Sequence, residues 1–231
     1  MKTLAIDTSQ AAGSVAAVDG ERVARRLLPT AVEHARLLSG ALVAAAAELG
    51  WTPAAAELVA VVRGPGSFTG LRVGVTTAKA IAWASGARLL GVSAGEVIAS
   101  ATAAALGPAA ADVPIEVVFD AGRGDLFACT AAPAPQSVSG WRTSPGFLVN
   151  AEHWLAGVGT AAVVAGPGLA VVADVRGRRP DLLMATGDGL PLAEAVAAIA
   201  LLRAVAGEAD APETLVPEYI RPSYAEEPRR A

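Results

Sequence analysis

The stretch Arg63-Gly64-Pro65-Gly66-Ser67-Phe68-Thr69-Gly70-Leu71-Arg72-Val73-Gly74, together with the helix that it begins, decides the fold of this chain. It follows Leu58-Val59-Ala60-Val61-Val62, a short apolar run rich in β-branched residues, which is typical of a buried strand. The glycines give the loop backbone freedom on either side of Pro65, whose φ angle is fixed. Thr69 is placed to cap a helix over residues 70–85. The sequence therefore predicts a strand, a tight loop and a helix in direct succession.

The predicted helix is apolar on more than one side. Its only long polar side chains, Arg72 and Lys79, lie seven residues apart on one narrow strip. An ordinary surface helix has a single apolar face, which packs on its own sheet. We therefore expect a second surface to cover the other side of residues 70–85.

A glycine-rich loop between a strand and a helix can also bind phosphate through the N–H groups at the start of the helix. The Walker loop requires Lys-Ser or Lys-Thr directly after its last glycine, whereas this loop continues Gly70-Leu71-Arg72. The glycine spacing of the dinucleotide fingerprint is absent as well. We therefore favour a tight turn that lets the helix pack closely over a phosphate site.

The composition contains enough hydrophobic residues to form a sizeable hydrophobic core. Hydrophobic residues make up 53% of the 231 residues and charged residues 17%, which excludes disorder over most of the length. The net charge is −4, so nucleic-acid binding by the chain alone would lack its usual electrostatic basis. The single Cys129 cannot form an internal disulfide. With no signal peptide and no apolar run of membrane-spanning length, we expect a cytoplasmic protein without a membrane segment.

The sequence predicts two halves, residues 1–108 and 109–231, with Gly107-Pro108 at the boundary. In the first half we expect a mixed sheet covered by helices. Its elements, in order, are strands over 2–7, 13–18 and 23–28, a helix from a capping box at Thr30–Glu33 to about Leu49, the strand 58–62, the helix 70–85, a strand over 88–92 and a helix reaching Leu106.

The second half repeats two features of the first. A strand ends in an acid at Asp7 and again at Asp120, and Val163–Gly168 repeats the Gly-Pro-Gly ending of Val61–Gly66. The same two features in the same order indicate a duplicated unit. A last helix over residues 191–206 and the tail after it are expected to pack back on the first half.

Asp7 and Asp120 are the candidate nucleotide-binding residues. Two acids at strand ends, facing a cleft between duplicated halves, could hold a hydrated metal ion with a nucleotide. In the alternative interpretation, each acid accepts hydrogen bonds from its own turn. Without a clear phosphate loop or a base, the second interpretation is the better supported.

No catalytic or metal-binding residue is predicted. His34 has Leu38 four residues later, so the helix lacks a pair of histidine ligands, and we expect His34 at the polar edge of an interface. Ser67 does not lie in a Gly-x-Ser-x-Gly nucleophile elbow.

Five segments resemble the TsaB (YeaZ) family, bacterial subunits of the machinery that places threonylcarbamoyl on the adenosine beside the tRNA anticodon. They are Leu4–Ser9, Glu33-His34, Arg63–Gly74, Asp120–Asp125 and Pro217–Arg221. The resemblance spans essentially the whole chain. It implies an actin-like, kinase-like (ASKHA) α/β fold of two duplicated halves, each with a mixed sheet flanked by helices.

The resemblance also implies a non-catalytic scaffold that activates the paralogue TsaD, which carries the histidine pair that Leu38 excludes here. Such subunits form homodimers alone, pair with TsaD through their first two helices, and are then joined by the small ATPase TsaE. ATP and a divalent metal belong to the assembled complex, no cofactor is expected on this chain alone, and tRNA is reached only through the complex. The alternatives are an autonomous actin-like ATPase or kinase, which Asp7 and Asp120 would serve, and a metallopeptidase, against which the missing histidine ligands argue.

The partner surface is expected on the first two helices. An alanine-rich run, Ala44–Ala47, permits close approach, and the two helices side by side would present an apolar patch too large to leave in water. Some of the candidates must face the sheet instead. The candidates are His34, Leu38, Ala41 and Leu42 on the first helix and Val73, Thr76, Thr77 and Ala80 on the second.

Overall fold

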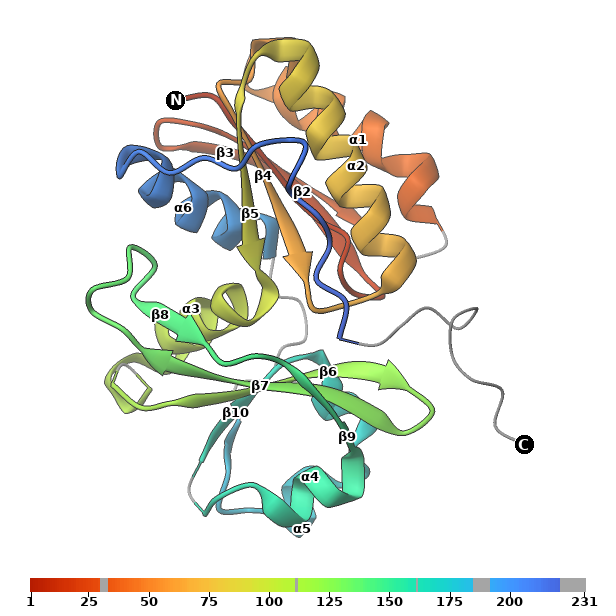
Figure 1. Ribbon diagram of the computed structural model, residues 1–231, viewed down its shortest axis with the longest axis vertical. Coiled ribbons are helices and arrows are strands. Elements are labelled where there is room, and N and C mark those ends of the chain that lie inside the picture. The colour runs from red at the N-terminus through yellow and green to blue at the C-terminus, as the bar shows by residue number, and fades with distance from the viewer. Residues whose placement is uncertain (30–32, 111, 161, 185–191, 221–231) are drawn as a thin grey trace.

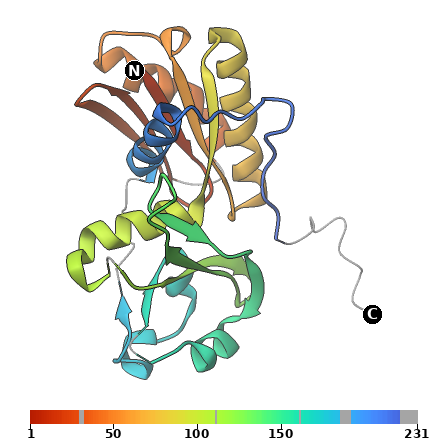
Figure 2. The same ribbon diagram turned by 60° about the vertical axis from the view of Figure 1, so that its left-hand side comes forward.

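A computed structural model describes residues 1–29, 33–110, 112–160, 162–184 and 192–220. Two mixed sheets, one from each half, lie one below the other with helices against their faces (Figures 1 and 2). The capping box predicted at Thr30 and the expected start of the last helix at Pro191 lie outside the described residues. Among the described helices, none is both long and apolar enough to cross a membrane.

The first sheet has the strand order β3-β2-β1-β4-β5. Its strands are β1 (Thr3–Asp7), β2 (Gly13–Asp19), β3 (Arg22–Leu28), β4 (Leu58–Gly64) and β5 (Arg88–Ser93). The first three form an antiparallel meander, and β4 and β5 run parallel to β1. Helices α1 (His34–Glu48) and α2 (Phe68–Ser85) cover one face, and α6 (Leu192–Val205) covers the other (Figure 1).

The second sheet repeats this arrangement. Its strands are β6 (Ile115–Gly122), β7 (Asp125–Pro133), β8 (Trp141–Thr143), β9 (Phe147–Asn150), β10 (Val163–Ala165) and β11 (Leu183–Met184). The order is β11-β10-β6-β7-β8, with β9 also paired to β7, and β10 runs parallel to β6 as β4 does to β1. The shared order confirms two duplicated halves. Helices α4 (Ala151–Gly157) and α5 (Val175–Arg178) lie on one face, and α3 (Ala94–Leu106) lies on the other.

The duplication is incomplete after the repeated Gly-Pro-Gly segment. Gly64 ends β4 and α2 follows, but Gly166 is followed by a 3-10 turn, Pro167–Val171, instead of a full helix. The second half therefore lacks a counterpart of α2 at this position, although the strand before it is placed in the same way.

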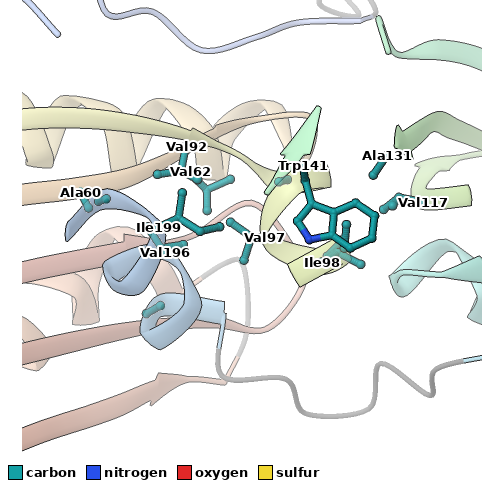
Figure 3. Close-up of a cluster of buried hydrophobic side chains, with 14 of the residues drawn as sticks. Ala60, Val62, Val92, Val97, Ile98, Val117, Ala131, Trp141, Val196 and Ile199 are labelled. Carbon is teal, nitrogen blue, oxygen red and sulfur yellow. The ribbon is translucent and has the colours of Figure 1, made fainter. Parts of the chain in front are cut away.

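One continuous core joins the two halves. Helix α3 packs on both sheets and on α6, so buried side chains run without interruption from one sheet to the other. Figure 3 shows this core, with Ala60, Val62, Val97, Val117 and Trp141 among its members. The halves are thus held together by apolar contact around α3.

The tail after α6 returns to the first half. The Asp210 N–H donates to the Leu89 carbonyl at 2.8 Å, and the Glu218 N–H donates to the Arg63 carbonyl at 2.7 Å. Leu215 between them is buried among the side chains that lie between the first sheet and helices α1 and α2. The tail therefore runs along β5 and β4 toward the start of α2 (Figure 1).

The cap of α2 differs from the prediction. The helix begins at Phe68, and the Oγ of Ser67 accepts the Gly70 N–H at 3.3 Å, so Thr69 is not the cap. Ser67 is held in place because its own N–H donates to the Ser9 carbonyl at 2.7 Å. The contact with Ser9, which follows β1 and lies far away in sequence, decides between the two candidate caps.

Candidate functional site

The two candidate acids each serve the turn that follows them. Asp7 is buried, and its carboxylate accepts the Ser9 N–H at 2.9 Å and the Ser9 hydroxyl at 2.6 Å. Asp120 is exposed, and its carboxylate accepts the Gly122 N–H at 2.7 Å. The two carboxylates share no hydrogen-bond partner among the described residues, and their surroundings differ. This geometry is what the turn interpretation predicts.

The glycines of the loop are used for close contact between α2 and the end of β1. A Cβ atom on Gly70 would lie 2.0 Å from the Thr8 carbonyl oxygen, and one on Gly66 would lie 2.4 Å from the Ser9 carbonyl oxygen. The Thr8 hydroxyl also donates to the Gly70 carbonyl at 2.7 Å. The backbone of residues 8 and 9 thus lies directly against the loop, as expected for a packing turn rather than a phosphate cradle.

The burial of Asp7 has a consequence for the pH dependence of stability. Burial raises the pKa of Asp7, and the hydrogen bonds from Ser9 oppose this to a smaller extent. The folded chain therefore holds this proton more tightly than the unfolded chain does. The free energy of unfolding should then fall as the pH rises from the pKa of the unfolded carboxyl group to that of the folded one.

We predict that this fall is absent in Asp7→Asn, whose amide oxygen can still accept the bonds from Ser9. Urea unfolding of both proteins at a series of pH values measures the difference. A wild type that gains stability relative to the variant as the pH rises would contradict the assignment.

The described residues offer no evident nucleophile or metal centre. No group of three or more His, Cys, Asp or Glu residues among them could hold a metal ion. Burial, with a smaller effect from the charges of Glu116 and Glu218, raises the pKa of Cys129 to about 12, so this thiol stays protonated.

His34 lies against Gly13, and neither of its ring nitrogens has a hydrogen-bond partner among the described residues. Burial lowers the pKa of His34.

The structure divides the eight predicted interface residues into two groups. His34, Leu38 and Leu42 are buried on the side of α1 that packs against β2 and β3. They stabilise the fold and are not accessible to a partner. The other five lie between or on the exposed sides of the two helices: Ala41, Val73 and Thr77 are half-buried, and Thr76 and Ala80 are exposed.

Two exposed residues of this surface were missed. The side chain of Trp83 is 84% exposed, and that of Val43 is 54% exposed. Trp83 lies three residues after Ala80 and seven after Thr76, so helical periodicity places it on the same strip. That spacing could have identified it from the sequence.

We call the resulting surface the helical face. It consists of Val43, Ala44 and Ala47 of α1 and Val73, Thr76, Ala80 and Trp83 of α2. The two helices lie side by side on the outside of the first sheet (Figure 1), and its exposed side chains are small or apolar. An apolar surface of this kind on a folded domain is typical of a protein interface.

The tail covers the remaining polar strip of α2. The Arg72 side chain donates from Nε to the Tyr219 hydroxyl at 2.9 Å, and its guanidinium group lies 3.9 Å from the centre of the Phe68 ring. Lys79 donates from Nζ to the Leu215 carbonyl at 3.2 Å. The sheet, α1 and the tail thus cover three sides of α2, and the helical face is the side left open.

Comparison with known proteins agrees with this architecture. The sequence profile of the TsaD family, described as tRNA N6-adenosine threonylcarbamoyltransferase, matches residues 29–136. No curated protein sequence matches the chain. A crystal structure described as an uncharacterized protein with similarity to peptidase YEAZ from Pseudomonas aeruginosa is 25% identical, with a TM-score of 0.77 over 95% of this chain and 99% of that one. The structure of YeaZ from Pseudomonas aeruginosa is 24% identical, with a TM-score of 0.75 over 94% of this chain and 99% of that one.

The likeness to the two structures covers both halves, and the match to the TsaD family includes both helices of the helical face. The two mixed sheets flanked by helices are those of the actin-like fold. The chain is therefore similar to the YeaZ structures over nearly its whole length and to the TsaD family over residues 29–136.

Proposed function

We propose that this chain is a cytoplasmic, non-catalytic scaffold subunit for threonylcarbamoylation of the tRNA adenosine beside the anticodon. In this proposal it activates TsaD by pairing with it through the helical face, and TsaE joins the pair. When alone, the chain forms a homodimer through the same face. Its similarity to the TsaD family and to the YeaZ structures supports a role in this tRNA modification.

The observation that carries the proposal is the helical face itself. It combines an exposed tryptophan, Trp83, with small exposed side chains on two adjacent helices. Aromatic anchors surrounded by small residues are typical of the energetic centres of interfaces. A contact that buries about 1,200–2,000 Å² in total would be of the size of a specific, stable interface.

The match to the TsaD family indicates how one surface could serve two partners. It covers residues 29–136, which include all of α1 and α2. A TsaD partner thus has a segment similar to the one that forms the helical face. Two copies of such a helix pair can meet around a twofold axis, and a related pair can replace one copy.

We further propose that ATP and a divalent metal act in the assembled complex and are not bound by this chain alone. Leu38 takes the place of a second histidine on α1, and the backbone of Thr8 and Ser9 lies against the glycine loop. Contact with tRNA would come only through the complex, in keeping with the net charge of −4.

Reconstitution tests this function. A mixture of TsaD, TsaE, ATP, tRNA and a threonylcarbamoyl donor should modify tRNA efficiently only when this chain is added. The chain alone should neither modify tRNA nor hydrolyse ATP. ATP turnover by the pure chain that Asp7→Ala abolishes would favour the autonomous ATPase instead.

A further inference from the structure

The second half contains a cavity of about 750 Å³ that is separate from the helical face. It lies between α4, the start of β6 and the strands β7, β9, β10 and β11, a region that Figure 1 shows at the lower end of the molecule. Cavities that bind small molecules have volumes of about 300–1,000 Å³. This cavity is therefore of the size of a ligand site.

The walls of the cavity are mainly apolar and include two aromatic side chains. The larger apolar residues are Val113, Phe147, Val149, Trp154, Val163 and Leu183. The side chain of Phe147 is 49% exposed, and those of Val113 and Leu183 are 38% exposed, so the cavity opens to solvent past apolar side chains. Such exposed apolar surface around an opening is what a ligand with a hydrocarbon part would cover.

The cavity also contains one carboxylate without a cationic partner. Glu116 is half-buried and is the only Asp, Glu, Lys or Arg among the described lining residues, which also include His153. Its Oε1 accepts the Thr130 hydroxyl at 2.8 Å, and no Lys or Arg of the described residues forms an ion pair with it. A half-buried carboxylate is stabilised by a cation that can donate hydrogen bonds to its free oxygen.

This combination selects a class of ligand. An anion would be repelled by Glu116. A bare metal ion needs several ligands, whereas the cavity offers one carboxylate, one hydroxyl and the imidazole of His153, and no group of three His, Cys, Asp or Glu among the described residues could hold a metal ion. A cation with a hydrocarbon body can pair with Glu116, lie against Phe147 or Trp154, and cover the apolar walls. We propose that the cavity binds an organic cation, a guanidinium or primary ammonium group on a short hydrocarbon stem.

The test uses n-butylguanidinium, n-butylammonium and n-butylurea as probes of matched size and different charge. Each is titrated into the full chain while the NMR signal of the Trp154 indole N–H is followed. Both cations should give saturable shifts, with binding at least about tenfold tighter than that of the uncharged urea, because only a cation pairs with Glu116. Equal binding of n-butylurea, or no saturable shift with either cation, would overturn the proposal.

Variants assign the binding to this cavity. Glu116→Gln keeps an acceptor for Thr130 but removes the charge, and should weaken n-butylguanidinium binding by at least about tenfold. Glu213→Gln makes the same change of charge on the exposed tail and should have no effect. Phe147→Ala, at the half-exposed opening, should also weaken binding and provides a second test should Glu116→Gln not fold. Unchanged binding in a folded Glu116→Gln or Phe147→Ala variant would refute the site.

A capped tripeptide with a central arginine then identifies the source of the cation. Binding at least about tenfold tighter than n-butylguanidinium would indicate an arginine side chain of a protein, since the peptide backbone adds contacts. Equal or weaker binding would indicate a free small molecule. The proposal is independent of the scaffold function, because the cavity and the helical face lie in different halves.

Discussion

Replacement of Gly70 by alanine is expected to lower the free energy of unfolding by about 2–4 kcal/mol. The new Cβ atom would lie 2.0 Å from the Thr8 carbonyl oxygen, a distance that no real contact allows. The backbone must move to remove this clash, because Thr8 directly follows β1 and Gly70 lies in the first turn of α2. That movement would also weaken the bond from the Thr8 hydroxyl to the Gly70 carbonyl.

Gly40 provides a matched control. It lies in α1, and a Cβ atom there would meet nothing within 4 Å. Gly40→Ala should therefore raise stability by about 0.5–1 kcal/mol, the usual gain from replacing glycine within a helix. Urea unfolding followed by circular dichroism compares the two variants. Equal stabilities for Gly70→Ala and Gly40→Ala would mean that the glycine loop does not hold α2 against β1.

The parts of the fold that depend on local patterns could be predicted. The strand, loop and helix of residues 58–85 follow from one β-branched run, one glycine loop and one apolar stripe. The duplication could be predicted because a similar close approach recurs. A Cβ atom on Gly66 would lie 2.4 Å from the Ser9 carbonyl oxygen, and one on the equivalent Gly168 would lie 2.8 Å from backbone atoms of Phe119 in β6. The close approach requires glycine in both halves, so it leaves a mark in the sequence.

The parts that depend on distant contacts could not be predicted in detail. Ser67 and Thr69 are both suitable caps for α2, and the contact of Ser67 with Ser9 selects the first. The use of Arg72 and Lys79 to hold the tail is another example, since their partners lie more than 130 residues away along the chain.

The candidate interface was predicted at the level of its helices but not of every residue. An apolar side chain at helical spacing can face its own sheet or a partner, and the spacing alone does not distinguish the two. Leu38 and Leu42 therefore appeared as interface candidates although they belong to the core. Trp83 was missed although its spacing from Thr76 and Ala80 places it on the same strip of the helix.

We expect Ala80→Arg to abolish both self-association and TsaD binding without unfolding the chain. Ala80 is exposed in the isolated chain, so the longer side chain fits there. Within an interface the same side chain would be an unpaired buried charge, which costs several kcal/mol. A loss of binding of at least about a hundredfold should follow. Trp83→Ala should weaken both contacts as well, by about 2 kcal/mol or more if Trp83 is an anchor.

Ala198→Arg is the matched control for this change. Ala198 is an exposed alanine of α6, on the opposite face of the first sheet from α1 and α2. It receives the same side chain and the same charge at a position outside the helical face. Circular dichroism of both variants should match the wild type, which separates a loss of binding from a loss of fold.

Sedimentation velocity, with and without TsaD from the same organism, tests the central claim that the helical face is the partner surface. Wild type and Ala198→Arg should sediment as dimers alone and as a complex when TsaD is added. Ala80→Arg should sediment as a monomer when it is alone. When TsaD is added, the variant should still sediment as a monomer, separately from TsaD. An Ala80→Arg protein that still dimerises and still sediments with TsaD would place the partner surface elsewhere on the molecule.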